Sequence, residues 1–128
     1  MTIVLDASAL LAALLDEPGR DRVDAVISGA MMTTVNLAEV VGHFARLGAA
    51  RPEIDALLAG LPITYMEPDA ALAIEVGLMR PTTDQAGLSL GDRMCLALAK
   101  RAGATALTAD RAWNKIAARL GVDVELIR

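Results

Sequence analysis

Short β-rich runs alternate with helical patterns along this chain, and this alternation limits its possible folds more than any other feature. Strands are expected at residues 2–5, 31–35, 63–67, 105–109 and 122–127. Between them lie stretches in which apolar residues recur every three or four positions, the spacing of an amphipathic helix. Strands joined by helices in this way form a parallel sheet with crossover connections. We therefore expect one α/β domain over residues 1–128, with a central parallel sheet of four to five strands flanked by helices.

The helical stretches carry recognisable ends. Helices are expected at residues 7–15, 20–28, 36–47, 69–80, 90–102 and 111–120, with a further one beginning at Pro52. Gly48 and Gly103 follow two of them, at the position where a helix end favours glycine. Pro81 is expected to end the helix at 69–80 and leave 82–87 as a polar loop. Asn36 stands at the start of its helix, and we expect it to be a cap rather than a ligand.

Nothing in the chain resembles a targeting or membrane segment. The first residues lack a basic start, and the carboxylate of Asp6 comes too early for a signal peptide. The longest apolar run, 7–15, is interrupted by Ser8 and is shorter than the roughly 20 residues that a membrane span needs. Cys95 is the only cysteine and lies in an apolar stretch, so a buried thiol is expected. These features predict a soluble, cytoplasmic protein.

The net charge of the chain is only weak evidence for or against a nucleic-acid partner. A formal net charge of -4 by itself disfavours general nucleic-acid binding. If four carboxylates held metal ions, however, the remaining charges would balance. Ten of the basic residues are arginine, which suits bidentate phosphate contacts. Phe44, Tyr65 and Trp113 are too few for a base-stacking platform, so a nucleic acid would be held mainly by its backbone or through metals.

Four acidic residues occupy positions that this layout brings to one edge of the sheet. Asp6 and Asp110 directly follow the first and fourth strands, and Glu39 and Asp92 lie in the first turns of the helices at 36–47 and 90–102. These strand ends and helix starts share the carboxyl edge of a parallel sheet. Ligand sites of open α/β sheets lie at that edge, where the strand order reverses. Asp6 and Asp110 flank this point if the first and fourth strands are neighbours.

Four converging carboxylates repel one another unless cations neutralise them. Their hard oxygen atoms suit Mg²⁺ or Mn²⁺, with water and substrate phosphate completing the shell. Such clusters hydrolyse phosphodiester bonds, because the metal lowers the pKa of the attacking water. Each acid taken singly is better interpreted as a helix cap or dipole partner, and Asn36-x-x-Glu39 has the spacing of a capping box. Four such coincidences at one edge shift the balance toward a catalytic site.

The segments around these acids resemble a known family. They are residues 3–10 (IVLDASAL), 33–40 (TTVNLAEV), 90–97 (LGDRMCLA) and 106–113 (ALTADRAW). In this order they are similar to the four motif blocks of PIN domains, in particular those of VapC-type toxins, and they span nearly the whole chain. The resemblance implies a PIN-like single-domain α/β fold.

The resemblance also implies a function. It indicates a divalent-metal-dependent endoribonuclease that hydrolyses RNA phosphodiester bonds as the toxin of a toxin–antitoxin pair. The implied partners are RNA, a second copy of the chain in a homodimer, and a cognate antitoxin whose C-terminal segment covers the site. The family's catalytic and metal-binding acids, with Mg²⁺ or Mn²⁺ as cofactor, carry over to Asp6, Glu39, Asp92 and Asp110. Ser8 and Thr108 match positions from which a hydroxyl supports an acidic ligand or a metal-bound water.

Several neighbours of the acids have two interpretations. Arg93 and Arg111 each follow a proposed ligand directly, and they could contact RNA phosphates or pair with local acids. His43 lies four residues after Glu39 and shares its helix face, where we expect it to be structural rather than a general base. Trp113 is expected to pack in the interior rather than to recognise a base.

Other functional classes fit less well. A phosphoacceptor signalling domain would need adjacent acids early in the chain and a lysine after a late strand, whereas Asp6 has no acidic neighbour and Lys115 lies within an expected helix. A phosphatase with a two-aspartate motif would need an acid where the chain has Ser8. A non-catalytic α/β module that binds RNA or a partner is the alternative that stays open, since fold does not fix function.

Overall fold

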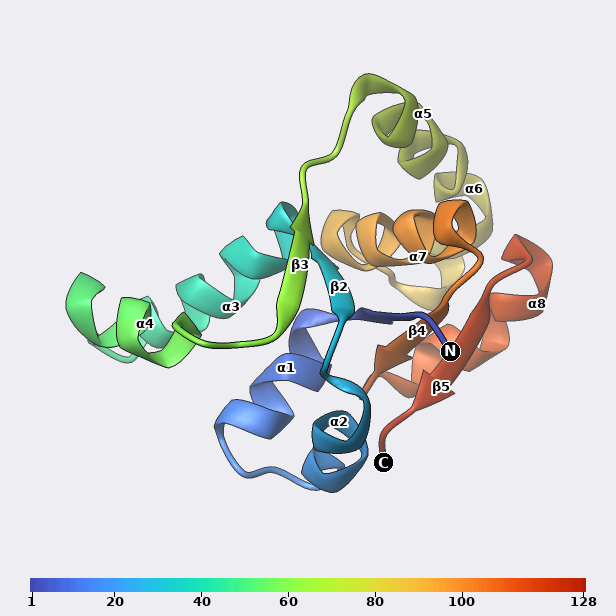
Figure 1. The fold of residues 1–128 in the computed structure, drawn as a ribbon. Coiled ribbons are helices and arrows are strands. Elements are labelled where there is room, and N and C mark those ends of the chain that lie inside the picture. The colour runs from blue at the N-terminus through green and yellow to red at the C-terminus, as the bar shows by residue number, and fades with distance from the viewer.

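The five strands form one parallel sheet. The computed structural model describes all residues, Met1–Arg128. Its strands are β1 (Ile3–Leu5), β2 (Ala30–Thr33), β3 (Ile63–Met66), β4 (Thr105–Thr108) and β5 (Asp123–Leu126). Their order in the sheet is β3-β2-β1-β4-β5, and every neighbouring pair is parallel (Figure 1). The first and fourth strands are therefore neighbours, and the strand order reverses there as expected.

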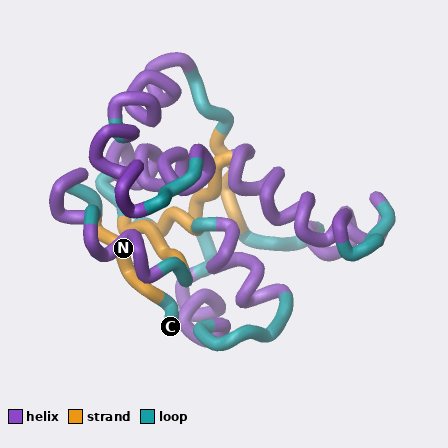
Figure 2. The backbone as a smooth tube through the Cα atoms, turned by 180° about the vertical axis from the view of Figure 1, so that it is seen from behind, coloured by secondary structure: helices purple, strands orange, loops and turns teal.

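Helices cover both faces of this sheet. Those contributing to one core are α1 (Ala7–Leu14), α2 (Arg20–Val26), α3 (Thr34–Arg46) and α4 (Arg51–Leu58). The other face is covered mainly by α5 (Ala70–Leu78), α7 (Leu90–Ala102) and α8 (Ala117–Leu120), with α6 (Arg80–Thr83) and the 3₁₀ helices η1 (Asp84–Ala86) and η2 (Arg111–Lys115) beside them. The strands lie between these helices, and the pair α3–α4 projects away from the sheet (Figures 1 and 2). None of these helices combines the length and the hydropathy that a membrane-spanning helix needs.

The strand side chains alternate between two buried cores. Ile3 and Leu5 of β1 pack with α1, α2 and α3, while Val4 packs against α7 on the opposite face. Such alternation follows from the two-residue period of a strand. Trp113 and Cys95 are fully buried in the α7 core, which confirms the expectations for both.

The start of α3 differs from the sequence prediction. Strand β2 ends at Thr33 and α3 begins at Thr34, two residues earlier than expected. Thr33 is the cap, because its Oγ1 accepts a hydrogen bond of 3.1 Å from the backbone N–H of Asn36. The prediction that Asn36 caps the helix is therefore wrong. Its side chain is fully buried inside the first turn and is free for other partners.

Two further segments were predicted incorrectly. Residues 82–87 are not a plain loop, since α6 and η1 cover most of them. Pro81 lies in the first turn of α6, where its missing N–H leaves no helical bond unmade, so it begins a helix instead of ending one. The helix expected at 111–120 is divided into η2 and α8. Trp113 and Ile116, both buried, are three residues apart, which matches the period of a 3₁₀ helix.

Candidate active site

The four predicted acids line one cavity of about 440 Å³ at the carboxyl edge of the sheet. They come from four different places in the fold, namely the ends of β1 and β4 and the first halves of α3 and α7. The cavity is lined by Asp6, Ala7, Ser8, Leu11, Glu39, Gly42, His43, Arg46, Asp92 and Asp110. The structure therefore brings together the acids that the sequence places at one edge.

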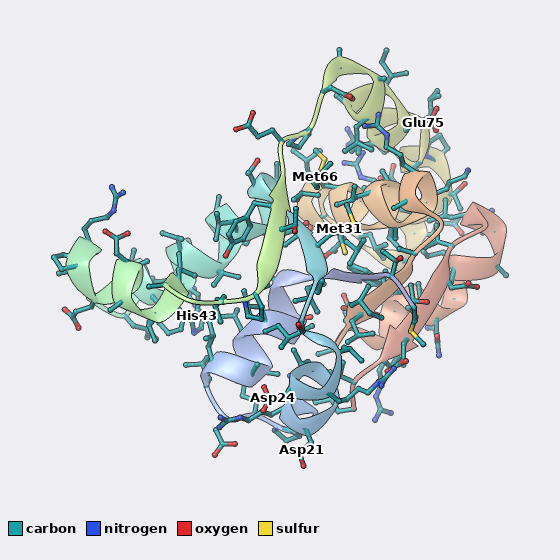
Figure 3. All side chains as sticks on the ribbon, viewed as in Figure 1. Asp21, Asp24, Met31, His43, Met66 and Glu75 are labelled. Carbon is teal, nitrogen blue, oxygen red and sulfur yellow. The ribbon has the colours of Figure 1, made fainter.

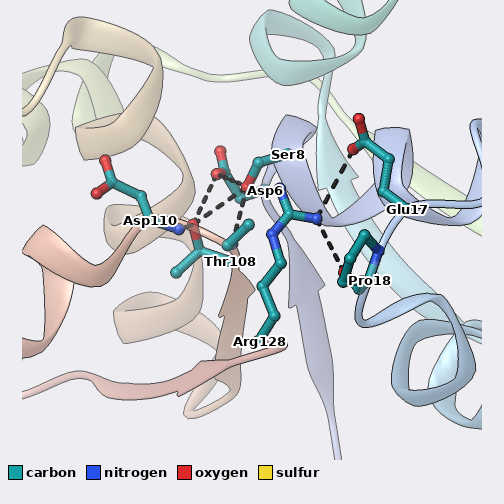
Figure 4. Close-up of polar contacts among 8 residues, drawn as sticks. Asp6, Ser8, Glu17, Pro18, Thr108, Asp110 and Arg128 are labelled. Atoms are coloured by element: carbon teal, nitrogen blue, oxygen red, sulfur yellow. Dashed lines mark hydrogen bonds and ion pairs between the residues drawn. The ribbon is translucent and has the colours of Figure 1, made fainter.

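Asp6 is the most buried of the acids, with only 4% of its surface exposed. Its Oδ2 accepts hydrogen bonds from the hydroxyls of Ser8, at 2.7 Å, and Thr108, at 2.9 Å (Figure 4). The same hydroxyls accept bonds from the backbone N–H groups of Ala109 and Asp110, both at 3.0 Å. Ser8 and Thr108 thus join the ends of β1 and β4 and hold the Asp6 carboxylate between them. Asp6 follows β1 at the N-cap position of α1, but its side chain makes no cap bond, so its interpretation as a capping side chain does not apply.

The environment of Asp6 disfavours its ionised form. Burial is the main cause, and the nearby carboxylates of Asp92 and Glu39 add to it. The hydrogen bonds from Ser8 and Thr108 act in the opposite direction but are outweighed. Together these effects raise the pKa of Asp6 from 3.8 to about 6.

A chain of buried hydrogen bonds positions Glu39. The hydroxyl of Thr33 donates to Oδ1 of Asn36 at 2.6 Å, which fixes the orientation of the amide. Nδ2 of Asn36 then donates to Oε1 of Glu39 at 2.8 Å and to the carbonyl of Gly91 at 3.0 Å. Gly91 lies so close that a Cβ built there would come within 2.5 Å of Oε1 of Glu39. This contact brings the first turn of α7 against Glu39 and ties α3 to α7.

Asp92 and Asp110 are each anchored by a local backbone bond. Oδ2 of Asp92 accepts from the N–H of Ser89 at 2.8 Å, and Oγ of Ser89 accepts from the N–H of Asp92 at 3.2 Å, which makes a capping box at the start of α7. Oδ1 of Asp110 accepts from the N–H of Ala112 at 3.0 Å. Burial raises the pKa of Asp92, and the negative charge of Asp110 raises it further. Both acids therefore serve as caps as well as facing the cavity.

The four acids share one arrangement of their oxygen atoms. In each carboxylate one oxygen accepts hydrogen bonds from the protein, and the other accepts none. None of the four forms an ion pair, because all ion pairs of the chain involve other acids. The cavity therefore holds oriented, un-neutralised carboxylates with an oxygen available on each.

These donors fit a hydrated divalent cation. No three of the chain's histidine, cysteine, aspartate or glutamate side chains converge closely enough to ligate one ion directly. Mg²⁺ does not require this, because it usually keeps several waters and binds proteins through one or two carboxylates. Burial raises the pKa of Asp6 and Asp92, and repulsion by neighbouring carboxylates adds to it; a cation of this kind would relieve the repulsion.

The two arginines proposed for phosphate contacts do not line the cavity. Nη1 of Arg93 donates to the carbonyl of Val76 at 3.0 Å, so its head is engaged with the end of α5. Arg111 is exposed in η2 and forms no ion pair. The structure thus offers no support for a phosphate contact by Arg93 and leaves that of Arg111 as a prediction.

Two basic residues that sequence reasoning either missed or interpreted as structural do line the cavity. They are His43, labelled in Figure 3, and Arg46. The signal for both was the spacing from Glu39, since residues four and seven positions later lie on the same helix face. His43 therefore faces the acids.

Asn36→Ala is expected to destabilise the protein by about 2 to 4 kcal/mol, because it leaves the hydroxyl proton of Thr33 without an acceptor and the Gly91 carbonyl without its buried donor. It would also release the Glu39 carboxylate. Urea unfolding followed by circular dichroism measures the change. The matched control is Asn114→Ala, since Asn114 is exposed, and it should change the unfolding free energy by less than about 0.5 kcal/mol. Equal, small effects of both variants would contradict the role given to Asn36.

The family assignment follows from the sequence of the whole chain. The sequence model of the PIN domain matches residues 3–119. This chain belongs to the PIN-domain family. The matched range includes all four segments that resemble the PIN-domain motif blocks. Among curated proteins no sequence match is found.

Solved structures share the fold of this PIN domain over almost its full length. A DNA-bound VapBC complex from Salmonella typhimurium is similar with a TM-score of 0.77 and 20% identity, covering 100% of this chain and 99% of that chain. VapC20 from Mycobacterium tuberculosis, a toxin that cleaves the sarcin–ricin loop, has a TM-score of 0.73 and 17% identity over 88% and 93% of the two chains. FitAcB from Neisseria gonorrhoeae is similar with a TM-score of 0.66 and 21% identity, covering 98% of this chain and 97% of that chain.

Proposed function

We propose that this PIN domain is a divalent-metal-dependent endoribonuclease and the toxin of a toxin–antitoxin pair. The observation that carries the proposal is the set of four carboxylates around one cavity, each anchored through one oxygen and free at the other. A site built only for helix capping would not need these acids to converge from four elements. The similarity in fold to VapC20, a toxin that cleaves the sarcin–ricin loop, supports RNA as the substrate class.

In the proposed mechanism the four acids, Asp6, Glu39, Asp92 and Asp110, would hold hydrated Mg²⁺ or Mn²⁺ in the cavity, directly or through water. When bound, the metal would lower the pKa of an attacking water and neutralise charge that develops on the scissile phosphate. Ser8 and Thr108 keep the Asp6 carboxylate in one orientation, and Asn36 does the same for Glu39. The bond from the backbone N–H of Ser89 fixes the carboxylate of Asp92. This pre-organisation reduces the rearrangement needed when metal and RNA enter.

We further propose an antitoxin partner and a homodimer. The support for a partner is that several structures of similar fold are VapBC or toxin–antitoxin complexes. An open cavity with unpaired carboxylates is also a surface that a cationic segment of another protein could cover. Large apolar side chains on α5 stay exposed, with Ile74 at 63% and Leu78 at 68%, and such residues are common in interfaces. Light scattering of the isolated chain tests the dimer.

The test of the catalytic proposal is cleavage of a mixture of transfer and ribosomal RNA by antitoxin-free protein. Discrete fragments should form with Mg²⁺ or Mn²⁺ and disappear with EDTA. Asp92→Asn should lower the rate by about a hundredfold or more, because one charge facing the cavity is lost while the capping bond to Ser89 can still form.

The matched control for this experiment is Asp123→Asn. It removes one exposed carboxylate in β5 that lies outside the cavity, and it should leave cleavage unchanged. Metal-independent cleavage, or full activity of Asp92→Asn, would contradict the proposed site. Folded protein that binds RNA but never cleaves it would favour the non-catalytic module.

A further inference from the structure

Arg46 is the only lysine or arginine that lines the acid cavity. It lies in the last turn of α3 and its side chain is exposed. It forms no ion pair and no hydrogen bond, although four carboxylates line the same cavity. By contrast, Arg20, Arg51 and Arg80 each pair with an aspartate four residues away. Arg46 is therefore a free guanidinium at the rim of an acidic site.

The position of Arg46 along α3 gives its relation to the acids. It follows Glu39 by seven residues, which places it on the same helix face and about 10 Å further along the axis. Gly42 lies between them with open space where a side chain would be, and His43 lies beside it. The helix dipole explains why a cation is tolerated at this end of α3, but not why it faces the cavity. This face of α3 thus carries an acid at one end and a free cation at the other, and Gly42 places no side chain between them.

We propose that Arg46, with the neighbouring His43, binds a backbone phosphate of single-stranded RNA next to the phosphate that is cut. This inference rests on the proposed function, and it specifies which side chains would hold the RNA strand. Acids that bind metal would otherwise repel RNA, so a separate cationic contact is needed to hold the strand. The rise of about 10 Å along α3 from Glu39 to Arg46 is of the order of the spacing between neighbouring phosphates of an extended single strand. The planar guanidinium suits bidentate contact with phosphate oxygens, and the imidazole can donate a further hydrogen bond.

Salt dependence of RNA binding tests this contact. Binding of a short, labelled, mixed-sequence single-stranded RNA is measured by fluorescence anisotropy in Asp92→Asn protein with Mg²⁺ held constant. Adding Arg46→Ala should weaken binding about fivefold and reduce the slope of log affinity against log salt by about 0.7, the value for one lost phosphate contact on a single strand. Arg46→Lys should restore most of the slope, because it restores the charge.

The matched control is Arg119→Ala on α8, since Arg119 is exposed, forms no ion pair and lies outside the cavity. It removes the same charge and should leave both slope and affinity unchanged. In otherwise unmodified protein, Arg46→Ala should raise KM for RNA more than it lowers kcat. This split separates a binding role from a general loss of structure.

Three results would overturn the inference. An unchanged slope and KM in Arg46→Ala, while the unmodified protein cleaves RNA, would remove the phosphate contact and leave the proposed function intact. If Arg119→Ala changed the salt slope and the RNA affinity as much as Arg46→Ala, the effect would come from net charge alone. Absence of both RNA binding and cleavage in the unmodified protein would overturn the proposed function and this inference with it.

Discussion

Asp6→Asn is expected to stabilise the metal-free protein at neutral pH by about 2 to 3 kcal/mol, while it lowers RNA cleavage by about a thousandfold. The stability gain arises because the folded protein holds Asp6 in a site that disfavours its charge, with a pKa of about 6 instead of 3.8. Asparagine can still accept the hydrogen bonds from Ser8 and Thr108 but has no charge to bury. The lost activity reflects the loss of a charged oxygen that faces the cavity.

The raised pKa of Asp6 also makes the free energy of unfolding depend on pH in a definite direction. Between about pH 4 and pH 6 the unfolded chain has already lost the Asp6 proton, whereas the folded protein retains it. The stability contributed by Asp6 is therefore fully present below pH 4 and is lost as the pH rises through 6. In urea unfolding at several pH values, the difference between Asp6→Asn and the unmodified protein should be near zero at pH 4 and largest above pH 7.

Divalent metal should reverse this order of stability. A cation bound near Asp6 favours the ionised carboxylate, so Mn²⁺ should raise the Tm of the unmodified protein and have little effect on Asp6→Asn. Asp69→Asn provides a contrast, because Arg101 and the backbone N–H of Leu72 lower the pKa of Asp69 to about 2, and its replacement should not stabilise the protein. An Asp6→Asn variant that is less stable than the unmodified protein at neutral pH would contradict the electrostatic description of the site.

Gly91→Ala is expected to lower RNA cleavage by about a hundredfold while changing the unfolding free energy by less than about 1 kcal/mol. The added Cβ would lie 2.5 Å from Oε1 and 2.6 Å from Oε2 of Glu39, too close for any contact. The carboxylate is the far end of a flexible side chain, so it can move away without disturbing the core. Moving it breaks the bond from Asn36 and displaces one acid from the cavity.

A second helical glycine supplies the control. Gly77 in α5 has open space where a Cβ would lie, so Gly77→Ala should stabilise the protein by about 0.5 to 1 kcal/mol and leave cleavage unchanged. Rates from single-turnover cleavage and free energies from urea unfolding are compared for both variants. If Gly91→Ala retained full activity, the placement of Glu39 against α7 would not matter for the reaction.

Local patterns in the sequence were sufficient to predict the sheet and the edge of it at which the four acids lie. Alternating strands and helices predicted a parallel sheet, and chain order then placed Asp6, Glu39, Asp92 and Asp110 at one edge. This reasoning succeeded because each inference depends on residues close together in the chain or on the general direction of parallel connections. Helix α7, from Leu90 to Ala102, has the predicted bounds for the same reason, since both of its ends carry local signals.

Errors occurred where a local signal competed with a distant partner. Asn36 has the composition of a cap, but Thr33 precedes it and takes that role, which leaves the Asn36 amide to join Glu39 with Gly91, 55 positions further on. Pro81 carries the signal of a helix end, yet the same missing N–H is tolerated in a first turn. Neither choice can be read from the few residues around the position.

The sequence by itself thus determined the fold class, the edge at which the acids meet and the residue types available there. The tertiary structure alone decided which oxygen of each acid is anchored, that Ser8 and Thr108 share the Asp6 carboxylate, that Gly91 lies against Glu39, and that Arg46 lines the cavity unpaired. The physical reason is the range of the interactions. Periodicity and capping act over a few residues, whereas hydrogen bonds, burial and the pKa of Asp6 depend on groups up to about a hundred positions apart that only packing brings together.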